Sequence, residues 1–177
     1  MNRLAAALAM LLLAAATVVP PVPEPQGYRG EPYRAPVPET LAGATVLDLA
    51  GTEAWRARGA VLIDVLPEVR RPENLPEGTL WRAPAYRTIP GAIWLPGTGY
   101  DVLAPRDEAA FFAALDRLTQ GDRTAPLVFF CKTDCWMSWN AAKRAVARGH
   151  SQVGWFPGGV DDWQAEGREL VPADSAL

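Results

Sequence analysis

Short runs of apolar residues recur along the chain and predict buried strands. The clearest are VLIDV at 61–65, LVFF at 127–130 and VGWF at 153–156. Runs of this length are too short for a buried helix, and their lack of polar alternation is typical of strands covered on both faces. Two further short strands are expected at Ala44–Leu49 and Ala92–Leu95.

Helical segments alternate with these strands. Asp107–Leu118 is the clearest, because its apolar side chains recur at spacings of three and four behind an acidic first turn. Thr52–Arg58 is shorter, with Thr52 as candidate N-cap and Gly59 as stop signal. The alternation predicts an α/β domain with a mostly parallel sheet flanked by helices. The remaining helices are expected after residue 135 and, behind a Gly158-Gly159 turn, over Asp161–Glu166.

A long excursion, Leu66–Arg87, interrupts this alternation. It is rich in proline and charge, and loops of such length in compact domains tend to cover or shape sites. Trp81 and Tyr86 are expected to pack it down. Just before it stands Asp64, whose carboxylate either points into an active-site crevice or caps a nearby loop through backbone N–H groups. The capping role is favoured, because buried acids are usually held by hydrogen bonds.

The first 43 residues differ in composition from the rest. Residues 1–19 start with a short basic segment, continue as the apolar run Leu4–Val19 and contain three alanines at 14–16, which is the pattern of a cleavable secretory signal. The run is shorter than the roughly 20 residues of a membrane span. Cleavage and a periplasmic location are therefore favoured over an uncleaved anchor, and no stable membrane span is expected after signal removal.

Residues 20–43 form a proline-rich tether, because proline excludes helix and central strand and favours extended geometry. A solvated linker is the favoured interpretation. The two Tyr-Arg pairs of this segment leave a second interpretation open, in which it is an arm that lies on the domain or docks on a partner. Residues 44–170 then make up the folded domain.

The composition limits the classes of function. At 49% apolar and 21% charged residues, a chain of 177 residues suits one hydrophobic core. The formal net charge is −3 and the sequence has no basic stripe, so nucleic acid is not an expected partner. The chain has only two cysteines, and in an exported protein these meet an oxidising environment. A disulfide between them must therefore be considered before free-thiol chemistry.

Both cysteines fall between the second apolar run and the helix that follows it. Cys131 ends the strand, and Cys135 stands at the start of the helix. Open α/β sheets place their chemistry at the carboxyl ends of strands. A helix N-terminus also stabilises a thiolate through its dipole and its unpaired amides. We therefore expect Cys131 to be reactive. The binding loop around it is expected to consist of Lys132, Thr133, Asp134, Trp136 and Met137.

Several roles of the pair remain open. Attack by Cys131 followed by resolution by Cys135 would give a reversible redox or sulfur-relay pair, which is favoured. A structural disulfide is the alternative, although closing so short a loop stabilises by only about 2 kcal/mol. Two thiolates beside Met137 could instead hold Cu(I), although we assign no metal site. His150 lies roughly 15 Å away along the helix and is interpreted as a helix-terminal charge rather than a ligand or base.

Two tryptophans follow the loop at helical spacing. Trp136 and Trp139 could form a platform for a partner or cofactor at the mouth of the loop. Aromatic residues at this spacing are more often part of the core. Core packing is favoured for Trp139, and both roles stay open for Trp136.

The order of these landmarks resembles a rhodanese domain. VLIDV at 61–65, TIPGAIWLP at 88–96, VFFC at 128–131 and VGWFPGGVDDW at 153–163 carry the resemblance, which extends over residues 44–167. It implies a rhodanese-like three-layer domain with a mostly parallel central sheet flanked by helices. It also implies that Cys131 accepts a sulfane sulfur as a persulfide, surrounded by the backbone N–H groups of its loop.

A narrower resemblance rests on the loop itself. The Cys-x3-Cys-Trp sequence from Cys131 to Trp136 is similar to the exported CXXCW-motif proteins associated with catabolism by pyrroloquinoline-quinone (PQQ)-dependent alcohol dehydrogenases. This similarity implies thiol/disulfide or persulfide chemistry in the periplasm, with a PQQ-dependent dehydrogenase or its cytochrome as partner. A non-catalytic module that binds a partner, Cu(I) or a redox cofactor on the same scaffold is the alternative.

The loop departs from the sulfurtransferase pattern at two places. Trp136 stands where the family usually has an arginine, and Asp134 and Cys135 stand where it often has small residues. Without the planar, five-donor guanidinium, the loop loses a bidentate clamp for thiosulfate, and Asp134 adds a repelling charge. Ordinary thiosulfate sulfurtransferase activity is therefore not expected.

Overall fold

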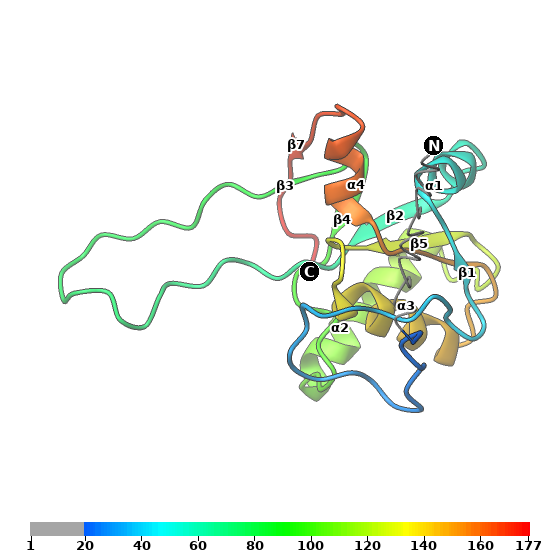
Figure 1. Ribbon diagram of the computed structural model, residues 1–177, viewed down its shortest axis with the longest axis horizontal. Helices are drawn as coiled ribbons and strands as arrows, with labels where there is room; N and C mark the ends of the chain where they lie inside the picture. Colours follow the sequence, from blue (N-terminus) through cyan, green and yellow to red (C-terminus); the bar gives the residue numbers. More distant parts are fainter. Residues whose placement is uncertain (1–19) are drawn as a thin grey trace, which may run out of the picture.

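The computed structural model describes residues 20–177, so the predicted signal at 1–19 lies outside the described residues. At its centre is a five-stranded sheet in the order β1-β6-β5-β2-β4, in which each neighbouring pair is parallel (Figure 1). The predicted α/β class is confirmed. The strands are β1 (Thr45–Val46), β2 (Val61–Asp64), β4 (Ile93–Trp94), β5 (Leu127–Phe130) and β6 (Val153–Phe156).

Helices cover both faces of the sheet and complete three layers (Figure 1). Successive residues of β5 alternate between two cores, because side chains of a strand point to opposite faces. Phe129 packs in the core formed with α2 and α3, whereas Phe130 packs in the core formed with α1 and α4. The helices are α1 (Leu49–Ala57), α2 (Pro105–Thr119), α3 (Trp136–Ala147) and α4 (Gly159–Ala165).

The order of the strands defines where a ligand crevice forms. β4 is added on one side of β2, and β5 and β6 are then added on the other side. Such a reversal opens a crevice at the carboxyl ends of the two strands that flank it, here β2 and β5. Asp64 at the end of β2 pairs in register with Phe130 at the end of β5, and Cys131 follows directly.

The start of α1 corrects one prediction. The helix begins at Leu49, and its N-cap is Asp48 rather than Thr52. The carboxylate of Asp48 accepts the N–H of Gly51 at 2.7 Å, which satisfies an amide that has no partner within the helix. Thr52 is instead buried inside the helix, where its hydroxyl donates to the carbonyl of Asp48. Gly59, with φ 88°, follows the helix as predicted.

The middle of the excursion after β2 projects from the body of the domain (Figure 1), whereas its two ends line a pocket together with Lys132 of the cysteine loop. Its ends are anchored near Trp94, whose indole N–H donates to the carbonyl of Leu66 at 2.7 Å. The ring of Tyr86 stacks on Trp94 with centroids 3.8 Å apart, so Tyr86 packs down as expected. Trp81 is half-buried. β3 (Arg87–Thr88) then pairs antiparallel with β7 (Val171–Pro172) near the C-terminus.

The proline-rich segment is an arm that lies along α3, rather than the solvated linker that was favoured (Figure 1). The Asn140 side chain donates to the carbonyl of Arg29 at 2.8 Å and accepts the N–H of Arg29 at 2.9 Å. The Trp139 indole donates to the carbonyl of Thr40 at 3.1 Å. Because two side chains of α3 bind main-chain groups of the arm, its course is fixed along the helix.

None of the helices formed by residues 20–177 combines the length and the apolar character that crossing a membrane requires.

Candidate functional site: the Cys131–Cys135 loop

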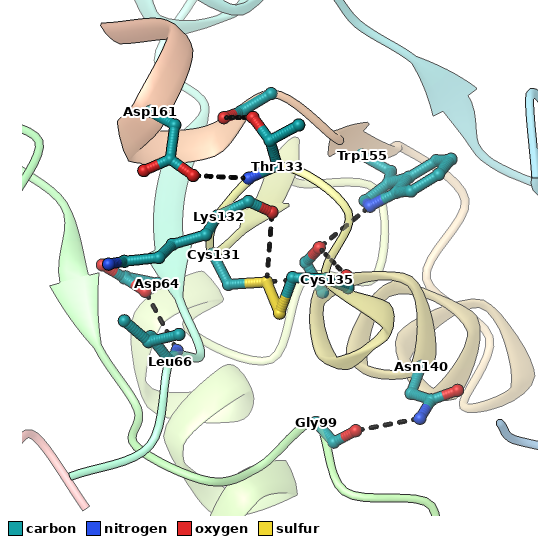
Figure 2. The surroundings of a disulfide bond; sticks show 12 residues. Asp64, Leu66, Gly99, Cys131, Lys132, Thr133, Cys135, Asn140, Trp155 and Asp161 are labelled. Atoms are coloured by element: carbon teal, nitrogen blue, oxygen red, sulfur yellow. Dashed lines mark hydrogen bonds between the residues drawn. A yellow bond between two sulfur atoms is a disulfide. The ribbon is translucent and has the colours of Figure 1, made fainter. Parts of the chain in front are cut away.

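A tight loop joins the buried strand β5 to helix α3 and contains both cysteines (Figure 2). All four residues of β5 are buried, so the strand delivers Cys131 at the edge of the core. Asp134 turns the chain with a left-handed φ of 52°, which aspartate tolerates better than most residues. Cys135 then has the extended backbone of an N-cap, and the helix starts at Trp136.

Cys131 and Cys135 are joined by a disulfide, with their Cα atoms 6.5 Å apart (Figure 2). Neither sulfur is open to solvent, since the exposed fractions are 0% for Cys131 and 2% for Cys135. A pocket of about 530 Å³ beside the loop is lined by Lys132, Tyr86 and Trp94, but by neither cysteine. An external molecule therefore reaches the disulfide only after part of the structure moves.

Carbonyl groups, rather than amides, face the sulfur of Cys131. The carbonyl oxygens of Lys132 and Cys135 lie 3.8 Å and 3.6 Å from Cys131 Sγ. The N–H of Thr133 donates to Asp161 Oδ2 at 3.1 Å, and the N–H of Trp136 donates to the carbonyl of Tyr33 at 2.9 Å. Two of the amides expected to surround a thiolate or persulfide are thus already bonded, which corrects the picture of an open anion cradle.

The start of α4 packs against the back of the loop. The N–H of Val160 donates to the carbonyl of Cys131 at 3.0 Å, and the hydroxyl of Thr133 donates to the carbonyl of Gly158 at 3.1 Å. A Cβ atom on Gly159 would lie 2.3 Å from the oxygen of Cys131, and the residue has φ 54°. Glycine is required there, because both the backbone conformation and the close approach exclude a side chain. The Cys131 end of the loop is therefore held by main-chain contacts.

The arm covers the opposite, Cys135 end of the loop. Arg34 forms an antiparallel β-bridge with Cys135, and the N–H of Ala35 donates to the carbonyl of Asp134 at 3.0 Å. The Trp136 indole donates to the carbonyl of Pro36 at 3.1 Å. The loop residues thus reach solvent mainly through Lys132, Thr133 and the exposed Asp134.

The tryptophans after the loop pack inward instead of forming an open platform. Trp136 and Trp139 are 3% and 0% exposed, and their rings meet edge to face with centroids 5.4 Å apart. Behind them, the indole N–H of Trp155 donates to Ser138 Oγ at 3.0 Å, and Ser138 donates to the carbonyl of Cys135 at 3.2 Å. This chain of bonds fixes the first turn of α3.

Asp64 is fully buried and accepts three hydrogen bonds. Leu66 donates its N–H at 3.0 Å, and the hydroxyls of Tyr86 and Thr88 each donate at 2.6 Å. The bond from the N–H of Leu66 is the capping of a nearby loop that the sequence predicted for Asp64. Burial raises the pKa of Asp64 to about 6, although these bonds and the positive charge of Lys132 oppose the shift. Asp64 therefore supports the crevice wall beside the cysteine loop.

Metal binding at the loop would need the reduced cysteines. In the structure both sulfurs are consumed by the disulfide, so neither is available as a thiolate ligand for Cu(I). Among residues 20–177 no group of three or more His, Cys, Asp or Glu side chains is arranged to hold a metal ion. Met137, the third candidate ligand, is buried in the core.

His150 is not the helix-terminal charge that the sequence suggested. It is buried at the end of α3, and its Nε2 lies 2.7 Å from Arg123 Nη1. Burial lowers the pKa of His150, and the positive charge of Arg123 lowers it further. The ring is therefore held as a neutral group of the core.

Sequence reasoning missed the residues that enclose the loop. Gly159 and Asp161 come from the first turn of α4, and Tyr33 comes from the arm. Asn140 had a weak signal, as a polar residue among the buried positions of α3. The two Tyr-Arg pairs were a weak signal for a docked arm, but its main-chain bonds had none, because they use carbonyl groups that every residue possesses.

Comparison with protein families gives a match to the rhodanese-like domain over residues 46–166. Among solved structures, the chain is similar to an uncharacterized protein from Saccharomyces cerevisiae, with 22% identity over 70% of this chain and 93% of that chain (TM-score 0.42). It is also similar to a thiosulfate sulfurtransferase from Pseudomonas aeruginosa, with 19% identity over 75% of this chain but only 21% of that chain (TM-score 0.48). For the polysulfide-sulfur transferase homodimer from Wolinella succinogenes, the identity is 20% over 73% and 80% of the two chains (TM-score 0.40). The comparison with curated proteins gives no match.

Proposed function

Because the chain belongs to the rhodanese-like domain family, we propose that it performs sulfur chemistry at the loop between β5 and α3. In this proposal Cys131 and Cys135 form a thiol/disulfide pair that is reversibly reduced, and the reduced pair can pass sulfur as a persulfide. The observation that carries the proposal is the bond between the two cysteines, at the carboxyl end of a central strand.

Thiosulfate sulfurtransfer fits this loop poorly. A thiosulfate dianion needs amide donors or a guanidinium, whereas carbonyl groups face Cys131 and the amides of Thr133 and Trp136 are bonded elsewhere. Trp136, in place of the usual arginine, points inward, and Asp134 is exposed as a negative charge. Thiol/disulfide exchange needs no anion cradle, because its substrate is a thiolate that attacks a sulfur atom.

The test is a redox titration of the purified protein with the thiols counted by mass after alkylation. We expect a single two-electron transition with a midpoint above roughly −300 mV, the upper limit of inert structural disulfides. A midpoint well below that value would support the alternative of a binding module with a permanent disulfide, which the burial of both sulfurs favours. Assay of thiosulfate and cyanide should give no turnover above the Cys131→Ser background.

The location and partner of the protein are a second part of the proposal. The secretory pattern of residues 1–19 and the similarity to CXXCW-motif proteins support export to the periplasm and action beside a PQQ-dependent dehydrogenase or its cytochrome. The mass of the protein from a periplasmic extract tests both export and redox state, since it reports signal removal, two missing hydrogens or an added sulfur. Recovery of the uncleaved chain from the cytoplasm would rule out this part.

A further inference from the structure

We infer that Cys135, rather than Cys131, is the sulfur that an incoming thiolate attacks, and that arm residues 33–36 must leave the loop before the attack. The inference rests on the proposed function and specifies how its substrate, an external thiol, enters. It reverses the order of attack that the position of Cys131 at the end of a strand suggested.

The two sulfurs are covered by parts of the structure that differ in how firmly they are held. Cys131 continues β5, which pairs with β2 on one side and β6 on the other. Its carbonyl accepts the N–H of Val160 and touches Gly159, so the start of α4 closes the space behind it. The side chain of Cys131 belongs to the core between the sheet and helices α2 and α3, so uncovering its sulfur would require opening that core.

Cys135 is covered by a segment that can leave without disturbing the sheet. Arm residues 33–36 meet the loop through the β-bridge of Arg34 to Cys135, the bonds described above from Ala35 to Asp134 and from Trp136 to Tyr33, and the Trp136 indole bond to Pro36. Water can take the place of these arm partners once the arm departs. The arm is therefore the removable cover.

The arm is also anchored separately from the loop. The hydroxyl of Tyr33 donates to the carboxylate of Asp101, and its ring packs edge to face on Tyr100. Further back along the arm, Arg29 is held by Asn140. Segment 33–36 can thus detach while the preceding part stays bound, and the strength of the Tyr33 anchor sets how often it does so.

The chemical step follows from this access. A thiolate attacks Cys135 Sγ, a new S–S bond forms between substrate and Cys135, and the bond to Cys131 breaks with its electron pair on Cys131. Cys131 then takes up the proton that the substrate thiol released. The carbonyls of Lys132 and Cys135 can accept a hydrogen bond from the resulting thiol, which stabilises the reduced form of Cys131 once it is protonated. A second substrate thiolate attacks the mixed disulfide, which releases Cys135 and the oxidised substrate.

The first experiment maps the attacked sulfur in the oxidised full chain. Glutathione in limiting amount is added, the reaction is stopped with acid, free thiols are alkylated at low pH, and the digested peptides are analysed by mass spectrometry. We expect glutathione on Cys135 and the alkyl group on Cys131. Glutathione on Cys131 would overturn the inference, while the measured midpoint potential would still decide the proposed function independently.

The second experiment measures the rate of reduction by glutathione in variants of the arm. Tyr33→Phe removes the hydroxyl that binds Asp101 but keeps the ring, so the arm should open more often and the rate should rise about tenfold, the value for one hydrogen bond to a charged group. Tyr28→Phe is the matched control on the same arm, because the Tyr28 ring packs on Arg144 and its hydroxyl makes no hydrogen bond to residues 20–177. An equal rate for Tyr33→Phe and the native protein would show that the arm does not gate the disulfide.

Discussion

The buried carboxyl group of Asp64 ties the end of β2 to the segment that follows it. Its three donors come from Leu66, Tyr86 and Thr88, so one side chain anchors both ends of the excursion. Burial makes the charged form costly despite these bonds, which is why its pKa is raised from 3.8 to about 6. The raised pKa of Asp64 should make the unfolding free energy depend on pH.

Asp64→Asn should remove a pH-dependent part of the unfolding free energy. Between about pH 4 and 6 the folded protein keeps a proton on Asp64 that the unfolded chain has lost, so stability falls as the pH rises through this window. The difference in unfolding free energy, native minus variant, should decrease by about 2 to 3 kcal/mol from pH 4 to pH 7. Urea unfolding at several pH values measures it. The exposed Glu169→Gln serves as control, and a similar slope in both variants would contradict the assignment.

Gly159 should tolerate alanine much less well than Gly167. Both residues have positive φ, at 54° and 71°, so alanine strains the backbone at either site by about 1 kcal/mol. At Gly167 nothing lies within 4 Å of the added Cβ, whereas at Gly159 it would collide with the carbonyl of Cys131. We expect a loss of at least about 3 kcal/mol for Gly159→Ala. Equal losses in urea unfolding would mean that α4 does not hold the cysteine loop.

Helix α1 depends on one capping side chain at its exposed N-terminus. Asp48→Ala should lower the unfolding free energy by about 1 kcal/mol, because the N–H of Gly51 loses its acceptor. Asp48→Asn keeps an acceptor and should cost only a few tenths of that amount. Thermal unfolding of both variants, compared at their midpoints, checks the prediction. If Thr52 were the cap, Asp48→Ala would have no effect.

The elements that the sequence predicted best are those whose burial is uniform. The strands 127–130 and 153–156 were placed at their observed ends, since every residue in them is apolar and buried. Helix α1 was placed three residues late. Its first turn, Leu49 to Gly51, carries no helical period, so Thr52 looked like the better cap. Local pattern thus located the layers and the cysteine loop, but not the capping detail.

The arm shows what the sequence could not supply. Its prolines predict an extended chain, which is equally compatible with a linker in solvent and with a strand laid on a surface. Contacts with α3 decide between the two. Three side chains of this helix bind main-chain carbonyls of the arm: Asn140 binds Arg29, Trp139 binds Thr40 and Trp136 binds Pro36. The enclosure of the disulfide therefore arises from pairing between distant segments, each of which looks unremarkable alone.

The projecting excursion should contribute little to the stability of the whole molecule. Leu80 is fully exposed, and the hydrogen bonds of stretch 71–80 to described residues, Arg71 to Thr79 and Thr79 to Pro76, are internal to the excursion. Replacing 71–80 by a short Gly-Ser linker keeps the anchors at Leu66 and Tyr86. A shorter loop costs slightly less entropy to close, by about 0.6 kcal/mol for each halving of its length.

The unfolding free energy of this linker variant should therefore be equal to that of the native chain or slightly higher, by less than about 1 kcal/mol. Urea unfolding measures the difference, with replacement of the docked arm residues 33–36 by Gly-Ser as the contrasting variant. That replacement should destabilise by more, because it removes apolar side chains that pack on the core. A loss of more than 2 kcal/mol in the 71–80 variant would mean that the excursion packs on the domain. If the 71–80 variant keeps the native unfolding free energy, the exposed side chain of Leu80 does not contribute to folding.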